Sequence, residues 1–261
     1  MSIYSVYFSP TGGTRRVARI IAGEFEAVEE LDICRYENSR REWKFNAEDI
    51  CIISVPSFGG RVPAPAADCL ARMSGGGALA ILVAVYGNRD FDDTLLELGD
   101  CISQSGFQIV AAIAAVAEHS IIREFGAGRP DQIDTEILRS FARRIRTSLE
   151  EEHPEDESRR AVPELPGNRP YREYHGVPFK PVAGSECTGC GICAGECPVQ
   201  AIPQADPAAA DNEICISCMR CIMVCPQHAR GNSEQMLAGA REKMKAFCTE
   251  PKENQLFINS R

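Results

Sequence analysis

The sequence contains no apolar run long enough to cross a membrane. Its longest apolar runs, Ala78–Tyr86 and Ile109–Ala117, are far shorter than the roughly 20 residues that a membrane-spanning helix needs. An excess of positive charge is also lacking, because 28 lysines and arginines stand against 37 aspartates and glutamates, a net charge of −9. This balance argues against nucleic acid as a partner and favours docking on basic surfaces of protein partners.

A targeting segment and the common catalytic motifs are lacking as well. The first residues, MSIYSVYF, have neither a basic region nor a long apolar core, so we expect a cytoplasmic protein. The sequence has no GxxxxGK[ST] phosphate loop and no GxGxxG dinucleotide fingerprint. No pairing of nucleophile and base suggests a catalytic residue, so we assign none.

Cysteine, in contrast, is abundant, with 13 residues in a chain of 261. Eight of them form two runs of identical spacing, Cys-x2-Cys-x2-Cys-x3-Cys-Pro, that begin at Cys187 and at Cys215 and lie 28 residues apart. Three thiolates on one loop and a fourth just beyond is the spacing that holds a [4Fe–4S] cluster, so the two runs predict two clusters. Structural zinc is the alternative, because zinc sites share part of this spacing.

In two-cluster runs of this kind, the fourth cysteine of each run ligates the cluster of the other run. Cluster I is therefore assigned to Cys187, Cys190, Cys193 and Cys225, and cluster II to Cys215, Cys218, Cys221 and Cys197. This part of the chain resembles the two-cluster bacterial ferredoxins over about residues 183–230. Exposed clusters of this type are damaged by oxygen, so the resemblance favours an anaerobic host.

Five further cysteines lie outside the two runs. We expect them to be small buried residues rather than ligands, and a reducing compartment rather than disulfides is indicated. They are Cys34, Cys51, Cys69, Cys101 and Cys248.

Residues 1–149 read as alternating strands and helices. Near-continuous apolar strands between amphipathic helices predict an α/β fold, a parallel sheet covered on both faces, and five strands fit the flavodoxin-like doubly wound order 2-1-3-4-5. The predicted strands are Ile3–Phe8, Leu31–Cys34, Ile50–Val55, Ala78–Tyr86 and Phe107–Ala117, and the predicted helices are Thr14–Phe25, Ala64–Met73, Asp92–Ser105 and Asp131–Glu152.

Three loops at the carboxyl ends of these strands suit a ligand that has a phosphate group and an aromatic ring system. The first loop has hydroxyls and glycines at a helix N-terminus, which suits a phosphate group, whereas a plain strand–helix turn is the alternative. Its candidate ligands are Ser9, Thr11, Gly12, Gly13 and Thr14. The other two loops supply aromatic, glycine and polar residues for a ring system, namely Phe58, Gly59, Tyr86, Gly87, Asn88, Arg89 and Phe91. With these three loops, residues 1–149 resemble a short-chain flavodoxin, and the resemblance implies that the loops bind flavin mononucleotide (FMN).

Two of the residues near this predicted site carry specific expectations. Arg89 beside the pyrimidine edge would stabilise anionic reduced flavin, because an opposite charge favours the ionised form; a solvated loop arginine is the alternative. His119, in the Glu118–Ser120 segment at the end of the last strand, is a candidate proton donor to the flavin.

The two halves are joined by residues 150–182, which begin with a charge run and continue with five prolines. We expect an exposed linker that becomes an extended strap, with Tyr171, Tyr174 and Phe179 packing on one or both domains. The ferredoxin-like domain is predicted at 183–232, and a C-terminal helix and tail at 233–261.

A flavodoxin-like half, a strap and a two-cluster half together resemble the fused flavodoxin–ferredoxin proteins of anaerobes, the EFR-type ferredoxins. The segments Leu165–Tyr171 and Ala127–Asp131 add to the resemblance, which spans about residues 1–232. It implies an electron-transfer protein that couples one- and two-electron carriers through FMN and two [4Fe–4S] clusters, with redox proteins as donors and acceptors. The alternatives are a flavin-dependent reductase of a quinone, nitro compound or corrinoid-type cofactor, and a sensory or docking module with an empty flavin site.

Overall fold

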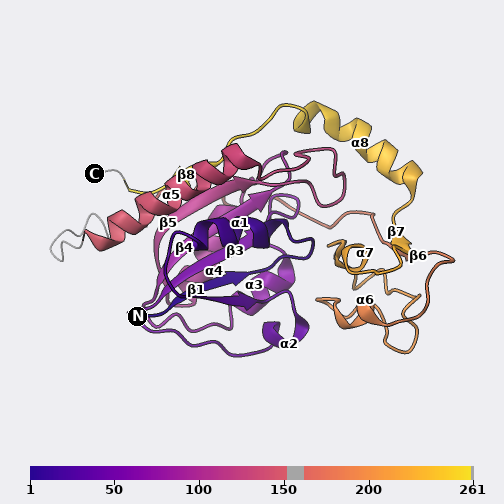
Figure 1. Ribbon diagram of the computed structural model, residues 1–261, viewed down its shortest axis with the longest axis horizontal. Helices are drawn as coiled ribbons and strands as arrows, with labels where there is room; N and C mark the ends of the chain where they lie inside the picture. The colour runs from indigo at the N-terminus through magenta and orange to yellow at the C-terminus, as the bar shows by residue number, and fades with distance from the viewer. Residues whose placement is uncertain (152–161, 260–261) are drawn as a thin grey trace.

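The N-terminal half is a parallel sheet with helices on both faces. The computed structural model describes residues 1–151 and 162–259 (Figure 1). The strands β1 (Ile3–Tyr7), β2 (Val28–Asp32), β3 (Ile50–Pro56), β4 (Leu79–Tyr86) and β5 (Gln108–Val116) pair in parallel in the order β2-β1-β3-β4-β5. The predicted doubly wound order is therefore confirmed.

Two helices cover each face of this sheet. Helices α1 (Gly13–Ala22) and α5 (Gln132–Glu150) share a core with one face, whereas α3 (Ala64–Leu70) and α4 (Thr94–Gln104) share a core with the other. The short helix α2 (Tyr36–Ser39), which the apolar pattern does not indicate, follows β2. The inner strands are buried on both sides, which explains why their sequences are apolar without alternation.

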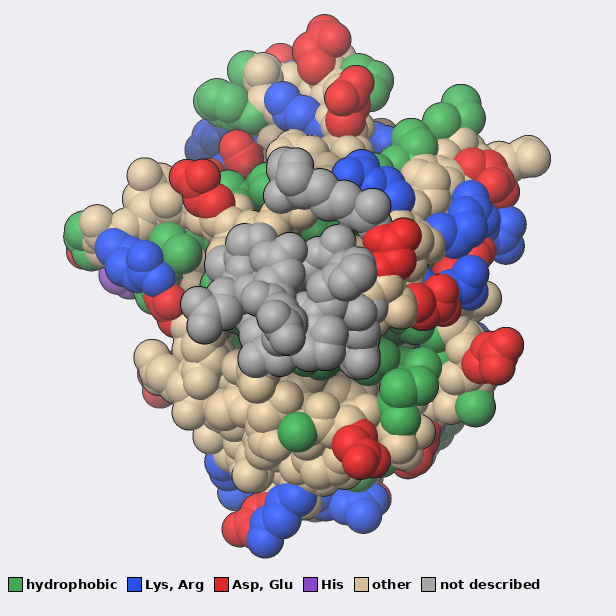
Figure 2. Space-filling view, turned by 90° about the vertical axis from the view of Figure 1, so that its left-hand side faces the viewer, with side chains coloured by type: hydrophobic (Ala, Val, Ile, Leu, Met, Phe, Trp, Pro, Cys, Tyr) green, Lys and Arg blue, Asp and Glu red, His purple; other side chains and the backbone are tan. Residues whose placement is uncertain are grey.

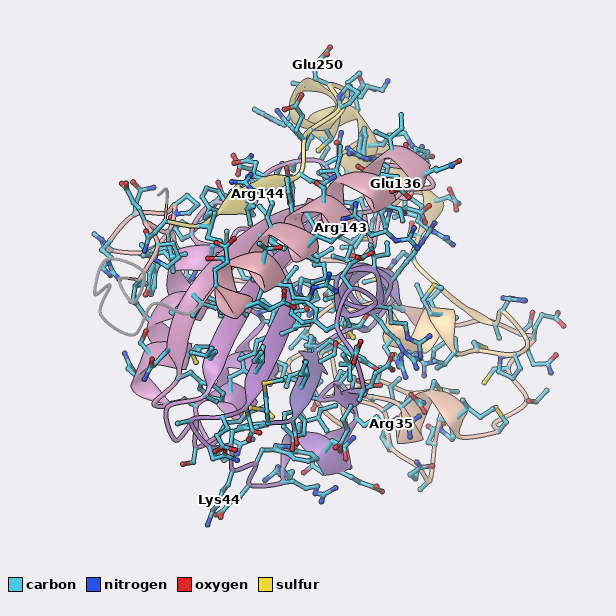
Figure 3. All side chains as sticks on the ribbon, turned by 60° about the vertical axis from the view of Figure 1, so that its left-hand side comes forward. Arg35, Lys44, Glu136, Arg143, Arg144 and Glu250 are labelled. Carbon is cyan, nitrogen blue, oxygen red and sulfur yellow. The ribbon has the colours of Figure 1, made fainter. Side chains whose placement is uncertain are left out.

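Helix α5 shows how the local sequence sets an element's limits and orientation. Asp131 accepts a hydrogen bond from the backbone N–H of Asp134, whose own carboxylate accepts from the backbone N–H of Asp131, a capping box that satisfies two N-terminal amides. Leu138, Ala142 and Ile145 face the sheet. Figure 3 shows Glu136, Arg143 and Arg144 on the outer side of the same helix. The helix ends at Glu150, and the predicted end at Glu152 lies outside the described residues.

The proline-rich segment 162–181 packs along α4 and is fixed there by hydrogen bonds and an ion pair. Asp93, at the start of α4, accepts from the backbone N–H groups of Asn168 (2.8 Å) and Arg172 (2.7 Å). Asp100, further along the helix, pairs with Arg169. The segment therefore forms the predicted strap; the acidic and basic run over residues 152–160 lies outside the described residues.

The C-terminal half repeats one small unit twice. It contains a two-stranded antiparallel sheet of β6 (Val182–Ala183) and β7 (Arg230–Gly231) and the single-turn helices α6 (Ile192–Gly195) and α7 (Arg220–Met223). The two helices start 28 residues apart, like the cysteines around them. The apolar core of this half is small, with Cys193, Ala194 and Ile202 as its buried members.

The chain then returns to the first half. Helix α8 (Glu234–Cys248) packs on the 121–125 loop, and the final strand β8 (Gln255–Phe257) pairs antiparallel with β5 at the sheet edge (Figure 1). Asn254 fixes this strand, because its side chain accepts from the N–H of Val116 and donates to Asp134. The helix lies within the expected C-terminal segment, whereas β8 is an element that the sequence pattern did not indicate.

The surface carries charges of both signs. On the face shown in Figure 2, acidic and basic side chains are interspersed rather than gathered into fields of one sign. Among the described residues, none of the helices combines the length and apolarity needed to cross a membrane.

Candidate cofactor site

The loop between β1 and α1 has the geometry of a phosphate cradle. Gly12 occupies the left-handed region (φ 91°) as the N-cap of α1, a conformation that favours glycine. Ser9 turns its hydroxyl inward and accepts from the N–H of Arg15 at 2.9 Å. This bond takes up one N–H group of the first helical turn, whereas among the described residues no hydrogen bond takes up the N–H groups of Gly13 and Thr14, which remain available to an anion.

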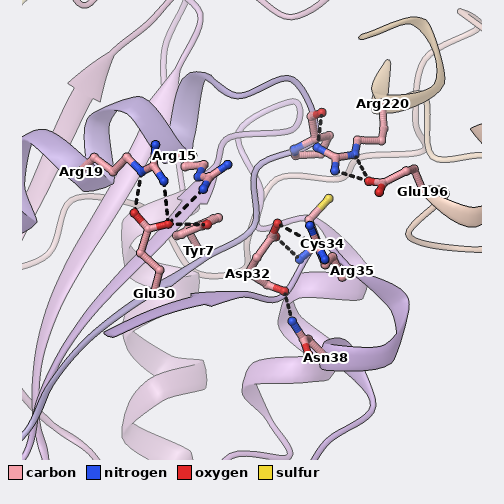
Figure 4. A network of polar contacts seen from close by, with 11 residues as sticks. Tyr7, Arg15, Arg19, Glu30, Asp32, Cys34, Arg35, Asn38, Glu196 and Arg220 are labelled. Atoms are coloured by element: carbon pink, nitrogen blue, oxygen red, sulfur yellow. Dashed lines mark hydrogen bonds and ion pairs between the residues drawn. The ribbon is translucent and has the colours of Figure 1, made fainter. Parts of the chain in front are cut away.

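Helix α1 is held in place from its outer side. Arg15 and Arg19 both reach Glu30 on β2, and Tyr7 donates to the same carboxylate (Figure 4). The hydrogen bond from Arg19 is the main reason that the pKa of Glu30 falls to about 2. The carboxylate therefore stays ionised and keeps the helix N-terminus fixed beside the sheet at neutral pH.

Two adjoining cavities open at the carboxyl ends of β1, β3, β4 and β5. The first, which we call the loop cavity, lies against the β1–α1 loop; the second, the ring cavity, lies beyond it under the strap. They adjoin each other and share five lining residues: Ser57, Phe58, Gly87, His119 and Ser120. A ligand site at this edge is what the strand order predicts.

Most of the predicted flavin residues lie at these cavities. Thr11, Gly13, Thr14, Phe58, Tyr86 and Gly87 line the loop cavity, and Phe58, Gly59, Gly87 and Arg89 line the ring cavity. Ser9 and Gly12 shape the loop without lining either cavity.

Two of the predicted flavin-binding residues, Asn88 and Phe91, do not line either cavity. The Asn88 side chain donates to the carbonyl of Cys248 (2.6 Å) and accepts from the N–H of Lys252 (2.9 Å), so it anchors the C-terminal segment. Phe91 is buried in the core beside Tyr86, with the ring centroids 5.3 Å apart. Neither side chain lines the cavities, because the returning tail, which sequence reasoning did not foresee, takes up their contacts.

His119 is built into the wall between the two cavities. Its Nδ1 accepts from the N–H groups of Ile121 (3.2 Å) and Ile122 (3.0 Å), so in the neutral ring the proton lies on Nε2. Burial, helped by the charge of Arg89, lowers the pKa of His119 to about 4. Gly87 permits this packing, since a Cβ there would lie 2.6 Å from the His119 ring. His119 is thus a neutral hydrogen-bond donor at pH 7.

Arg89 lies on the ring cavity but is not a free cation. Its guanidinium is paired with Asp92 and donates to the carbonyl of Asp90 at 3.3 Å. The pairing fixes the position of the guanidinium and offsets part of its charge. A ligand in the ring cavity would therefore meet a positioned, partly neutralised arginine.

Three further segments contribute lining residues to the ring cavity: the strap, the loop of the second cysteine run and α8. Tyr174, Val177 and Phe179 of the strap line it, together with Ser217 and Met244. Tyr174 lies so close to Gly59 that a Cβ at this position would collide with its ring. The aromatic content of the strap was a signal that it packs on the domains, but nothing in the sequence indicated contact with the cavity.

The four cysteines assigned to cluster II come together in the structure. Cys197, Cys215, Cys218 and Cys221 line one cavity, although Cys197 belongs to the first run and the others to the second. Among the described residues, no three His, Cys, Asp or Glu side chains converge closely enough to hold a single metal ion. A donor set of four thiols around one cavity fits a multi-iron cluster.

The repeat also places matching hydrogen bonds on the fourth cysteine of each run. The N–H of Ala201 donates to Sγ of Cys197 and the N–H of Ala229 donates to Sγ of Cys225, both at 3.3 Å. Hydrogen bonds to cysteine sulfur are among the factors that set cluster potentials. The other three cysteines assigned to cluster I lie on the loop around α6, where Cys190 is exposed and Cys193 is buried.

The cysteines outside the runs behave as packing residues. Cys34, Cys51, Cys69 and Cys248 are buried, and Cys101 is half-buried. Burial raises the pKa of Cys34 and of Cys51 to about 12, so these thiols stay protonated at neutral pH.

Comparison with known protein families identifies the second half. The model of the 4Fe-4S binding domain matches residues 183–202 and 209–230. The chain joins a flavodoxin-like domain to a 4Fe–4S binding domain. The first part of this statement rests on the strand order and the second on the family match. No curated protein matches the chain.

Several solved structures are similar to the flavodoxin-like domain. A flavodoxin of Streptococcus pneumoniae TIGR4 is 18% identical and covers 56% of this chain and 99% of its own (TM-score 0.39). Flavodoxin 2 from Bacillus cereus is 15% identical over 56% of this chain and 99% of its own (TM-score 0.40). The NADH:FMN oxidoreductase EmoB is 13% identical over 62% of this chain and 94% of its own (TM-score 0.42).

The 4Fe–4S binding domain is fastened to the flavodoxin-like domain and its strap. Arg220 of α7 donates to the carbonyl of Pro10 in the β1–α1 loop at 3.3 Å and pairs with Glu196 (Figure 4). The Ser217 hydroxyl donates to the carbonyl of Val177 at 3.1 Å. Cys218 lines both the loop cavity and the cavity of the four cysteines. The two candidate cofactor sites therefore share a wall.

Proposed function

We propose that the protein is an electron-transfer flavoprotein that relays electrons between FMN and two [4Fe–4S] clusters within one chain. The observation that carries the proposal is the shared wall. A cavity at the carboxyl ends of the sheet strands adjoins a cavity of four cysteine thiols, with Cys218 facing both. Adjoining sites of these two kinds suit transfer between cofactors, because electron transfer slows steeply with distance.

The residues at the loop cavity suit the phosphate end of FMN. The N-terminus of α1 supplies the backbone N–H groups of Gly13 and Thr14, and Thr11 and Thr14 line the same space. The ring cavity beyond it has apolar walls from Phe58 and Tyr174 that suit an aromatic ring system. FMN would bring the capacity to hold one or two electrons, whereas each cluster exchanges one.

The walls of the ring cavity favour a carrier over a reductase of small organic acceptors. A reductase needs a free flavin face on which its substrate can stack. At the ring cavity, Tyr174 and Phe179 of the strap and Met244 of α8 instead add walls from outside the flavodoxin-like domain. Electrons would then leave through the clusters, and redox proteins would be the partners.

Cofactor content is the first test. Protein purified without oxygen and without reconstitution should contain about eight iron atoms and one FMN per chain, four irons for each cluster. Iron at this level with no bound flavin, and none after addition of FMN, would contradict the relay. About four irons per chain would contradict the second cluster.

A variant of the β1–α1 loop tests the flavin site itself. Gly12→Ala places a side chain at φ 91°, and although no atom lies within 4 Å of the new Cβ, the strained backbone displaces the loop. We expect at least a tenfold higher Kd for FMN, equivalent to about 1.4 kcal/mol, and unchanged iron content. The matched control is Gly128→Ala, which has the same open surroundings and a positive φ of 77° but lies outside both cavities.

A further inference from the structure

We infer that the two clusters have fixed and different places in the relay: cluster II is the flavin-side cluster and cluster I is the partner-side cluster. This inference rests on the proposed function and adds the order in which electrons pass. Its basis is that the two copies of the cysteine run, equal in spacing, have opposite surroundings in the structure.

The loop of the second run lies against the flavin site. Cys218 has 9% of its surface exposed and faces the loop cavity. Ser217, one residue earlier, lines the ring cavity. Two consecutive residues of the cluster II loop thus form wall segments of both parts of the candidate flavin site. None of the cysteines of cluster I lines either cavity.

Arg220 connects this loop to the phosphate cradle. The side chain is 18% exposed and spans from Glu196, next to the cluster II ligand Cys197, to the carbonyl of Pro10. A hydrogen bond from a charged donor to a backbone carbonyl restrains the Pro10 peptide, which directly precedes the loop residues that face the anion. Arg220 is therefore a positioning residue that joins cluster II to the FMN phosphate loop.

The first run has no such attachment. The residue 28 positions before Arg220 is Ile192, which is 44% exposed, and Cys190 in the same loop is exposed. Gly189, the counterpart of Ser217, has no atom within 4 Å of where a Cβ would lie. An exposed cysteine beside an exposed apolar side chain leaves cluster I open to a one-electron redox protein.

Electrons and protons are conserved along the proposed route. One electron leaves an external one-electron donor protein for cluster I, passes to cluster II, and from there enters the flavin. Two such passages, with one proton taken up from solvent, complete the two-electron reduction of FMN to its anionic form. The reverse sequence serves a two-electron donor in the same way.

Thermodynamic linkage gives a test that does not depend on turnover. Because the anionic phosphate of FMN would lie nearer to cluster II than to cluster I, we expect FMN binding to lower the reduction potential of cluster II. Linkage then requires that reduction of cluster II weaken FMN binding by the equivalent free energy. The experiment is an EPR-monitored redox titration of the full-length protein with FMN bound and after FMN is removed. Cys190→Ala and Cys215→Ala, each lacking one cluster, identify the two EPR signals.

We expect the potential of cluster II to shift on removal of FMN and that of cluster I to stay unchanged. A shift of cluster I alone, equal shifts of both, or no shift of either would overturn the inference. Absence of FMN binding is a separate outcome, because it is seen in the flavin content before any titration and contradicts the proposed function instead.

A matched pair of variants tests Arg220. Arg220→Gln removes the ionic donor to Pro10 and Glu196, and we expect a Kd for FMN about tenfold higher, the effect of about 1.4 kcal/mol, with iron content unchanged. Ile192→Gln places the same side chain at the corresponding position of the first run and should leave FMN affinity as it is. Equal FMN affinity in the two variants would refute the role given to Arg220.

Discussion

The two copies of the cysteine repeat have the same backbone conformation, but their side chains differ at the positions where φ is positive. Gly189 and Ser217 correspond, with φ of 68° and 56°, and so do Gly191 and Met219, with φ of 78° and 63°. These left-handed conformations suit glycine and strain other residues. The first copy has glycine at both positions and the second at neither.

The surroundings explain the difference. Ser217 uses its hydroxyl to bind the strap carbonyl of Val177, and Met219 is 3% exposed and lines the cavity of the cluster II cysteines. In the second copy these contacts offset backbone strain that the first copy avoids. A repeat that folds the same way twice has thus been adapted on one side to a neighbouring domain, and the departures from the repeat mark that side.

The largest effect should come from breaking the crossed ligation between the copies. Cys197→Ala should remove cluster II, although this residue lies in the first run, and lower the iron content from about eight to about four per chain. Cys190→Ala should remove the same amount of iron but the other EPR signal. Loss of the same signal in both variants would show that each run binds its own cluster.

A second variant pair separates packing from backbone strain. Met219→Ala leaves the strained backbone and removes a buried side chain, so it should destabilise the protein by about 2 to 3 kcal/mol. Gly191→Ala introduces strain with no side chain lost, and should cost about 1 to 2 kcal/mol. The measurement is an anaerobic urea titration followed by cluster absorbance. A Met219→Ala protein more stable than Gly191→Ala would contradict the packing role.

Low pH should destabilise the folded protein through protonation of His119, which lines both cavities. The pKa of His119 falls to about 4 in the folded protein from an ordinary value of 6.5, so between these pH values the unfolded chain binds more protons. This contribution to stability is present above pH 6.5 and lost as the pH falls toward about 4, by at most about 1.4 kcal/mol per pH unit. Urea midpoints of FMN-free protein by circular dichroism should show this slope.

His119→Gln is the control for the acid effect. Glutamine does not titrate in this range, so the slope between pH 6.5 and 4 should become shallower in the variant. Any acid sensitivity of the clusters is common to both proteins and cancels in the comparison. An unchanged slope would remove His119 as the cause.

The smallest expected effect concerns one hydrogen bond, from the hydroxyl of Ser217 to the carbonyl of Val177 in the strap. Ser217→Ala removes the bond to the strap and should destabilise the protein by about 1 kcal/mol. Gly189→Ser places the same hydroxyl at the corresponding position of the first copy, where no partner lies within reach, and should also destabilise it. If Gly189→Ser proved stabilising, the contrast between the copies would not depend on the strap.

Patterns repeated over many residues predicted the fold well. Long apolar runs alternating with amphipathic helices led to the strand order, and cysteine spacing led to the domain that the family match identifies. Both patterns depend on local chemistry that tertiary contacts do not override. The boundaries of elements moved by a few residues, as at α1, which ends at Ala22 before the capping Gly23 rather than at Phe25.

Contacts between distant segments could not be predicted. Strand β8 has three residues, too few to show alternation, and its position depends on Asn254 meeting Val116 and Asp134 from far along the chain. The Asn88 side chain donates to the carbonyl of Cys248 at the end of α8 and so does not line the cavity. No local sequence pattern reveals this contact. The strap's contact with the ring cavity was hidden for the same reason, because a proline-rich segment carries no periodicity to indicate its face.

Strand β8 also changes what kind of connection joins the two halves. Because the last strand returns to the edge of the first sheet, the cluster half is an insertion within the flavodoxin-like fold, entered through the strap and left through α8. During synthesis this sheet receives its sixth strand only after every cluster cysteine has emerged. Because the 4Fe–4S binding domain is connected to the flavodoxin-like domain at both of its ends, it cannot rotate freely about a single linker, and the chain connections restrict the distance between the candidate cofactor sites.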